Sequence, residues 1–327
     1  MENKYDLLGF IAPQMQPPVP HPYIKDKDLC ISATACPPSI FFKGMNNRDM
    51  TMAMCSKVQE FRKTLEDNGA TIVLSRSDLK KPGLKVILNL QDPPPIPEAM
   101  KDLFDDGIRI SQIAYQGENN YGGGFLAHKT DVTDKAAYLI LEMKRTGMIL
   151  DLAHASDNTA FQVSLMSFVT QLPIFISHTG AYGLMPNKRN ASDFIIRSVM
   201  NQAGIVGVFN LTFCLDKLDN GVQPFVNHIQ YMRNLHPQAD QLLAYGSDWW
   251  YCDADYEKCK ETSDMIRAKV DPDGALGSRF PDQIFDLAGP NRMDKTETAL
   301  RIAFGAPFTR KFLSENAEAF LVQALPA

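Results

Sequence analysis

The chain has 327 residues, and its 33 Lys and Arg stand against 38 Asp and Glu, which gives a formal net charge of −5. Hydrophobic residues make up 45% and charged residues 22% of the chain, an ordinary globular composition that excludes a disordered protein. The mild acidity and the scattered basic residues argue against a nucleic-acid partner, and no apolar run approaches the roughly 18–20 residues of a membrane span.

The cysteine pattern and the first residues bear on the cellular compartment. The six cysteines include no Cys-x-x-Cys pair and are sparse for a chain of this length. The beginning of the chain has only a short apolar stretch, 7–12, and this is a poor match to a secretory signal. We therefore expect a reduced, cytoplasmic protein.

Eight short runs rich in β-forming residues follow one another along the chain. Several are almost continuously apolar, as expected for strands that are covered on both faces. The eight runs are 29–36, 71–74, 84–91, 108–115, 148–153, 173–177, 204–212 and 242–246.

Segments with helical spacing of apolar residues lie between these runs. The segment 57–65 stops at Asn68-Gly69, and the segment 133–144 stops at Gly147. A third, 192–202, stops at Gly204. Glycine just beyond a helix adopts the left-handed conformation that ends it, and Ser192 or Thr133 can cap a helix start.

This alternation predicts βαβ units and a parallel sheet, and eight units in about 300 residues are typical of a (β/α)8 barrel. The alternative is an open doubly wound sheet, but the glycine-rich nucleotide motif that usually follows its first strand is missing. We predict one domain: an N-terminal extension over 1–27, the barrel over 28–306 and a C-terminal helix over 307–327.

Three polar side chains stand where predicted strands end. His154 follows the fifth run, His178 the sixth and Asp248 the eighth. Barrel enzymes place their chemistry at the carboxyl ends of strands, where two neutral imidazoles can bind zinc and a carboxylate can move protons. Either histidine alone would more simply be a hydrogen-bonded polar residue, but the three together favour a metal site.

The motifs around these residues resemble those of the renal (membrane) dipeptidase family, a zinc-dependent branch of the amidohydrolase superfamily. The segment 151–156, DLAHAS, is similar to the family's DLSHVS motif, and 177–193 to its SH…HPRN.SD segment. The segment 246–248, GSD, resembles its GSDFDG motif. Further similar elements lie at 107–109, 142–148, 204–208 and 314–316, so the resemblance covers roughly residues 84 to 320 in family order.

The resemblance implies a role for individual residues. His154 and His178 would be the histidines of the family's second zinc site, and Asp248 the catalytic carboxylate that exchanges protons with water and the leaving amine. Arg189 would bind the terminal carboxylate of the substrate, because its guanidinium suits a bidentate contact. Tyr115, which replaces a family histidine near the reacting carbonyl, and Asn190 would also contact the substrate. The resemblance further implies a homodimer.

The pattern breaks at the family's first zinc site. Its His-x-Asp pair on the first strand aligns with Thr34 and Cys36, and its bridging glutamate aligns with Gln91. Cys36 could bind zinc as a thiolate, although a buried packing cysteine is the simpler interpretation. We therefore expect at most one zinc ion per chain, on the side of His154 and His178.

Three functions remain open from the sequence. The first is a metallohydrolase that cleaves a dipeptide or a related small amide with metal-activated water. The second is a catalytically silent barrel that binds a small peptide-like ligand or serves within a complex. The third is hydrolysis of another amide, a lactam or an ester on the same scaffold. The joint presence of His154, His178, Arg189 and Asp248 favours the first.

Overall fold

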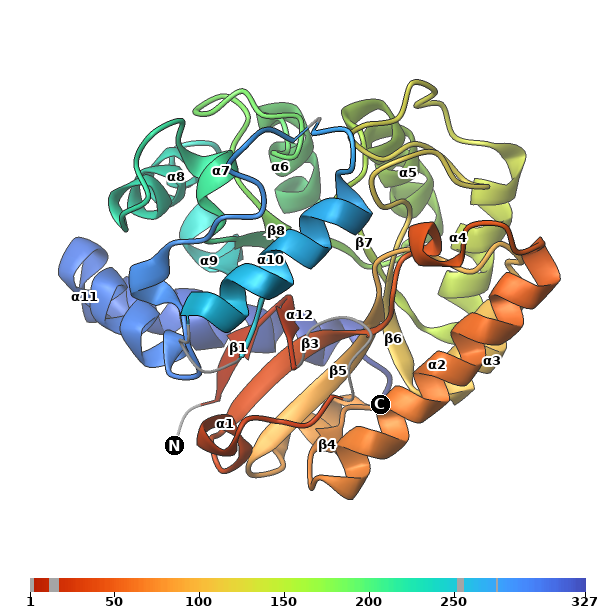
Figure 1. Cartoon of the computed structure of the whole chain (residues 1–327), viewed down its shortest axis with the longest axis horizontal. Helices are drawn as coiled ribbons and strands as arrows, with labels where there is room; N and C mark the ends of the chain where they lie inside the picture. Colours follow the sequence, from red (N-terminus) through yellow and green to blue (C-terminus); the bar gives the residue numbers. More distant parts are fainter. Residues whose placement is uncertain (1–2, 12–17, 252–255, 275) are drawn as a thin grey trace.

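The computed structural model describes residues 3–11, 18–251, 256–274 and 276–327, without the side chains of 250, 256–260, 262 and 285. Within these ranges, eight parallel strands neighbour one another in the order β1, β3, β5, β6, β7, β8, β9 and β10. The backbone N–H of Leu7 donates to the carbonyl of Tyr245 at 2.9 Å, so the first and last strands meet and nearly close a barrel (Figure 1). Their bounds are β1 Lys4–Asp6, β3 Leu29–Cys36, β5 Leu84–Leu90, β6 Ile108–Gln112, β7 Ile149–Asp151, β8 Ile174–Thr179, β9 Val206–Val208 and β10 Leu243–Tyr245.

Helices follow the strands and surround the sheet (Figure 1), which confirms the predicted (β/α)8 barrel. The longer helices are α2 Asn47–Asp67, α3 Ala99–Asp105, α4 Asp134–Thr146, α5 Asp157–Thr170, α6 Asp193–Asn201, α8 Gln223–Arg233, α10 Tyr256–Val270, α11 Arg292–Arg310 and α12 Asn316–Ala324. Shorter elements are β2 Gly9–Phe10, α1 Pro22–Lys25, η1 Ser39–Phe42, β4 Thr71–Ile72, η2 Arg76–Lys80, α7 Thr212–Leu215, α9 Ala239–Leu242, β11 Trp249–Trp250, η3 Phe285–Leu287 and the π-helical turn η4 Lys311–Glu315.

One member of the predicted set of eight strands is wrong. The run 71–74 forms only the two-residue strand β4, which pairs with Lys85 and Val86 at the start of β5. Since β3 occupies one edge of β5 along its length, β4 and β6 share the other edge, and β4 is not a barrel strand. The missing barrel strand is β1, which lies inside the segment 1–27, so this segment is not merely an N-terminal extension. Its three residues are too few to show a pattern in the sequence.

The predicted helix ends agree with the structure at two positions where the chemistry is visible. Ser192 precedes α6, and its side chain accepts a hydrogen bond from the backbone N–H of Ile195. Gly147 ends α4 with φ of 85° and ψ of 26°, the left-handed conformation that glycine adopts without a Cβ clash. These two residues therefore mark the end of α4 and the start of α6, the helices that precede β7 and β9 in the chain.

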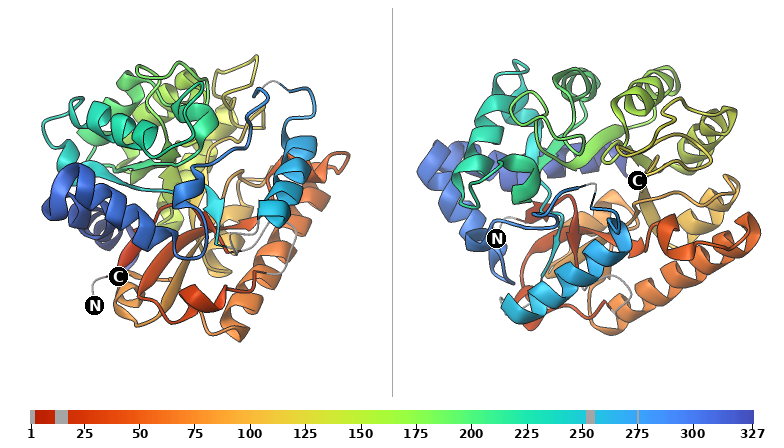
Figure 2. Two further views of the ribbon diagram at one scale, coloured as in Figure 1. Left: turned by 60° about the vertical axis from the view of Figure 1, so that its left-hand side comes forward. Right: turned by 45° about the horizontal axis from the view of Figure 1, so that its top comes forward.

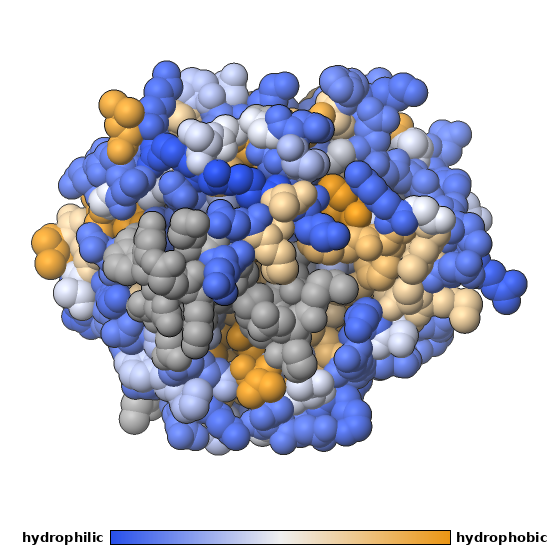
Figure 3. All heavy atoms as spheres, viewed as in Figure 1, coloured by the Kyte–Doolittle hydropathy of each residue, from blue (hydrophilic) through white to orange (hydrophobic). Residues whose placement is uncertain are grey.

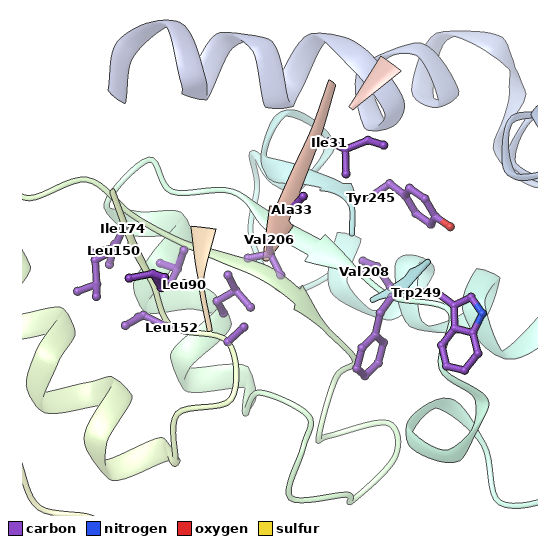
Figure 4. Close-up of a cluster of buried hydrophobic side chains, with 14 of the residues drawn as sticks. Ile31, Ala33, Leu90, Leu150, Leu152, Ile174, Val206, Val208, Tyr245 and Trp249 are labelled. Carbon is purple, nitrogen blue, oxygen red and sulfur yellow. The ribbon is translucent and has the colours of Figure 1, made fainter. Parts of the chain in front are cut away.

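The barrel interior is filled at one end by a layer of side chains. Each of the eight strand segments contributes one buried residue, and α12 packs Ala317, Phe320 and Leu321 against them. Seven lie within strands, and Ile205 directly precedes β9: Tyr5, Cys30, Ile87, Ile110, Ile149, Phe175, Ile205 and Ala244. Alternate residues such as Ile31, Leu150 and Val206 belong to a larger second cluster (Figure 4). Because α12 covers the amino end of the strands, the carboxyl end is left for a site.

Helix α10 lies at the carboxyl end, since its Ile266 and Val270 line a pocket together with His154 and Asp248. It crosses the front of the molecule in Figure 1, and Figure 2 shows it from two further directions. The surface drawn in Figure 3 is mostly hydrophilic, with small apolar patches between the hydrophilic residues. No helix among the described residues is both long and apolar enough to cross a membrane.

Candidate active site

Four polar side chains from different loops and strands meet at the carboxyl end of the barrel. The Nε2 atoms of His154 and His178 are 3.0 Å apart, and Asp248 Oδ2 lies 3.6 Å from His178 Nε2. Arg189, from the loop before α6, places Nη2 3.1 Å from His154 Nε2 and 3.6 Å from Asp248 Oδ2. The structure therefore brings together the two histidines, the carboxylate and the arginine that the sequence analysis selected.

The backbone is strained where two of these side chains are attached. His154 has φ of 66° and Asp248 has φ of 55°, in the left-handed region that residues with a Cβ seldom occupy. Hydrogen bonds hold both positions, because Phe125 N donates to the His154 carbonyl at 2.9 Å and Asp248 N donates to the Leu8 carbonyl at 2.8 Å. Such strain persists only where the surroundings fix it, and it is typical of functional sites.

A buried chain of hydrogen bonds orients His178. Asp151 accepts from the backbone N–H of Ala153 and of Ser177, each at 2.9 Å, and from Gln112 Nε2 at 3.0 Å. Burial raises the pKa of Asp151, whereas these N–H donors favour the ionised carboxylate. Ser177 Oγ lies 2.5 Å from Asp151 Oδ2 and 2.6 Å from His178 Nδ1. A serine hydroxyl carries one proton, so it donates to Asp151 and accepts from His178 Nδ1.

Arg189 fixes the tautomer of His154, so that its Nε2, like that of His178, carries a lone pair. Arg189 can only donate, so His154 Nε2 is its acceptor and the ring proton lies on Nδ1, which has no partner among the described residues. The two Nε2 lone pairs therefore face each other 3.0 Å apart, an arrangement that a cation between them would stabilise.

These residues fit one divalent cation. Two nitrogens bound tetrahedrally to zinc at about 2.0–2.1 Å lie about 3.3 Å apart, close to the distance between the two Nε2 atoms. Among the described residues, His154, His178 and Asp248 form the one group of three such side chains whose ligand atoms lie within 4.8 Å of one another. A cation bound here would compete with Arg189 for the lone pair of His154.

Burial dominates the protonation of the site. It lowers the pKa of both histidines well below the usual value, and the Arg189 guanidinium lowers them further, so both rings are neutral at pH 7. Burial raises the pKa of Asp248 to about 7, although the Arg189 charge opposes this. Neutral imidazoles suit metal binding, and a carboxyl group with a pKa near 7 suits proton transfer.

Of the two other residues predicted to contact the substrate, Tyr115 lines the pocket and Asn190 does not. The ring of Tyr115 lies against that of His154, tilted by 32° with centroids 4.5 Å apart, and Tyr115 lines the pocket. Asn190 does not line the pocket, because its Nδ2 donates to the carbonyls of Cys214 and Met185 and its Oδ1 accepts from Gly180 N. It supports the loop that carries Arg189.

The positions assigned to the first zinc site need a correction. Thr34 and Cys36 lie on β3, the second barrel strand, so they cannot be at the end of the first. Thr34 Oγ1 donates to Asn89 Oδ1, and burial raises the pKa of the Cys36 thiol, as expected for a packing cysteine. The first strand is followed by Leu8 and Phe10, which are no metal ligands.

The pocket combines a polar end with an apolar wall. Gln91, Gln116 and Tyr115 join His154, Arg189 and Asp248 at the polar end. The apolar wall consists of Phe10, Leu211, Phe213, Trp249, Ile266, Val270, Phe280 and Pro281. The wall as a whole was not predicted from the sequence, because its members come from five separate segments of the chain. The Asp151–Ser177 pair was not predicted either, although both residues lie close to the predicted histidines in the sequence.

The structure is thus a parallel (β/α)8 barrel whose carboxyl end carries a candidate metal-binding group of two histidines and a carboxylate. The family model described as membrane dipeptidase (peptidase family M19) matches residues 39–266, which is more than half of the chain. The chain belongs to this family.

Individual relatives are more distant. A dipeptidase of Aspergillus oryzae is 30% identical over 135 residues, which are 39% of this chain and 31% of that protein. The chain thus spans about a third of the length of the curated relatives that it matches.

Solved structures agree in fold. An amidohydrolase from Pseudomonas aeruginosa superimposes with a TM-score of 0.80 at 19% identity, over 98% of this chain and 95% of that one. A metallopeptidase from Rhodobacter sphaeroides, bound to a phosphinate mimic of the dipeptide L-Ala-D-Ala, gives 0.72 at 13% identity, over 99% of each chain.

Proposed function

We propose that this protein is a metal-dependent hydrolase of small amides, with dipeptides and related compounds as the substrate class. The observation that carries the proposal is the pair of Nε2 lone pairs 3.0 Å apart beside a carboxylate and a buried guanidinium. Membership of a dipeptidase family and the dipeptide mimic bound by the Rhodobacter sphaeroides relative support the substrate class.

His154 and His178 would hold one zinc ion, with Asp248 near enough to join them. When bound, such an ion lowers the pKa of water and polarises a carbonyl group. Arg189 binds the carboxylate of the substrate and so places the amide between the histidines and Asp248. Asp248 takes the proton from the attacking water and delivers it to the nitrogen of the leaving amine.

A second candidate is a binding protein without turnover. It is favoured by the neutral residues Phe10 and Gln91, which line the pocket after the first and third barrel strands and offer no charge for holding a cation. The two candidates differ in one measurable property, the turnover of a bound amide.

The experiment combines metal analysis with turnover. Protein purified without chelator should contain up to one zinc per chain, and His154→Ala should lose it. A panel of dipeptides and N-acyl amino acids with added zinc should then include a cleaved compound. Binding of panel members without any cleavage would favour the silent barrel, and two fully occupied ions would contradict the single-site proposal.

We also propose a homodimer formed through one apolar surface. This α5 face consists of Phe161, Leu165, Phe168 and Val169 with Phe194 of α6, and Phe168 and Val169 are 69% and 81% exposed. The rings of Phe161 and Phe194 lie 5.4 Å apart, so the face continues from α5 to α6. A continuous apolar surface of this kind is typical of a protein interface.

A further inference from the structure

The pocket has one end that suits an anion. The Arg189 side chain is 3% exposed, and its guanidinium lies over the rings of Phe125 and Phe209, 5.8 and 5.3 Å from their centroids. Its Nη1 donates to the His178 carbonyl at 3.4 Å, which fixes the plane of the group. A guanidinium fixed in this way can bind a ligand carboxylate with little loss of side-chain entropy.

Gln91 lines the same pocket and offers a neutral amide. The residue is 1% exposed and lines the pocket, and its Oε1 finds no hydrogen-bond partner among the described residues. A buried acceptor without a partner costs free energy, so a ligand N–H that reaches it would be favoured. A secondary amide supplies one N–H and one carbonyl, which is the complement of the glutamine side chain.

The rest of the described lining offers a cationic group no negative charge that is free of Arg189. Among the described lining residues, Asp248 is the sole carboxylate, and it lies 3.6 Å from the Arg189 guanidinium. An ammonium group placed on Asp248 would therefore be beside another cation, and one placed on the apolar wall would be buried without a partner. A metal ion held by the histidines would add further positive charge.

We propose that the pocket selects N-acylated apolar amino acids, with a free carboxylate and no charged amino group, over dipeptides with a free amino terminus. The carboxylate binds Arg189, the amide contacts Gln91, and the acyl group and side chain pack on the apolar wall. This inference rests on the proposed function in one respect, because it takes the pocket as the substrate site.

N-acetyl-L-phenylalanine and glycyl-L-phenylalanine test the inference, because they differ only in the amino group that the glycyl compound carries on the carbon next to the acyl carbonyl. Calorimetric titration of the full chain, with added zinc and again with chelator, should show at least about tenfold tighter binding of the acetyl compound, since an unpaired buried charge is costly. N-acetyl-L-phenylalaninamide, which lacks the carboxylate, should bind more weakly by at least about tenfold.

Gln91→Glu makes the test specific, because the change is nearly isosteric and adds the missing negative charge. It should reduce or reverse the preference for the acetyl compound, also in the presence of chelator, where no metal recruited by the new carboxylate can contribute. Gln241→Glu, at an exposed position of α9, should leave the preference unchanged.

Equal or tighter binding of glycyl-L-phenylalanine by the wild type would overturn the inference, and so would a protein that binds neither compound. An unchanged preference in Gln91→Glu would overturn the role of Gln91. Selective binding of the acetyl compound without cleavage would leave the inference intact and contradict only the proposed hydrolysis.

Discussion

Replacing Ser177 by alanine tests whether the buried hydrogen-bond chain behind His178 prepares it to bind metal. The change removes one oxygen, the one that lies 2.5 Å from Asp151 and 2.6 Å from His178. The N–H at His178 Nδ1 then loses its acceptor, and an unsatisfied buried donor costs about 1–3 kcal/mol. Loss of the partner that orients a metal-binding histidine typically lowers metal affinity about 10–100-fold, which is about 1.4–2.7 kcal/mol. We expect both effects in Ser177→Ala.

Zinc affinity is measured by competition with a chromogenic chelator at constant pH, and the free energy of unfolding by urea titration. Ser167→Ala is the matched control, because Ser167 is 1% exposed and its Oγ has no partner among the described residues. The control should bind zinc like the wild type. If Ser177→Ala also did so, while His178→Ala lost the metal, the proposed role of the hydrogen-bond chain would be refuted.

Three further predictions address catalysis, assembly and pH. Asp248→Asn should keep the fold and lower turnover of any cleaved amide by about 10²–10⁴-fold, because it removes the proton carrier, and unchanged turnover would end the mechanism. Phe168→Glu should shift a dimer to a monomer in light scattering, whereas Leu218→Glu, at an 89% exposed position elsewhere, should not. Burial would raise the pKa of Asp78, but hydrogen bonds from Lys81 and two backbone N–H groups outweigh it and lower that pKa. A lowered pKa stabilises the fold above the unfolded value of 3.8, so urea titrations should show Asp78→Asn less stable at pH 7 by about 1 kcal/mol, with the difference lost as the pH falls below 3.8 and through the lowered pKa of the folded state.

Long segments with a clear apolar pattern made the barrel predictable. The short run 71–74 was wrongly counted as one of its eight strands. Apolar runs such as 84–91 and helix ends such as Gly147 carry their own local signal. The strand β1 has three residues, Lys4–Asp6, and its place in the barrel depends on pairing with β3 and on the contact of Leu7 with Tyr245, more than 200 positions away in the chain. Such pairing leaves no pattern in the sequence, whereas Thr71 and Ile72 of β4 are β-branched and therefore have the composition typical of a strand.

The site was predictable where a single residue type at a strand end suffices. His154, His178 and Asp248 met that condition. Asn190 did not, because its place beside Arg189 in the sequence says nothing about which way its amide points, and in the structure that amide bonds to backbone carbonyls. The error at Thr34 and Cys36 followed directly from the missed strand, since every alignment to a first strand depends on which strand is first.

Charge links the number of cations in the mouth to the kind of ligand that it accepts. Two cations about 3.5–4 Å apart require several carboxylates, and the described lining supplies Asp248 alone. Even one cation near His154 would lie close to the guanidinium of Arg189, whose Nη2 is 3.1 Å from the same nitrogen. A ligand carboxylate bound to Arg189 neutralises that repulsion. It also draws the guanidinium away from the lone pair of His154 Nε2. Metal and anionic ligand should therefore each raise the affinity for the other, since coupling between two sites is reciprocal. A cationic ligand would have the opposite effect, so the residues that restrict the metal count also set the charge of the substrate.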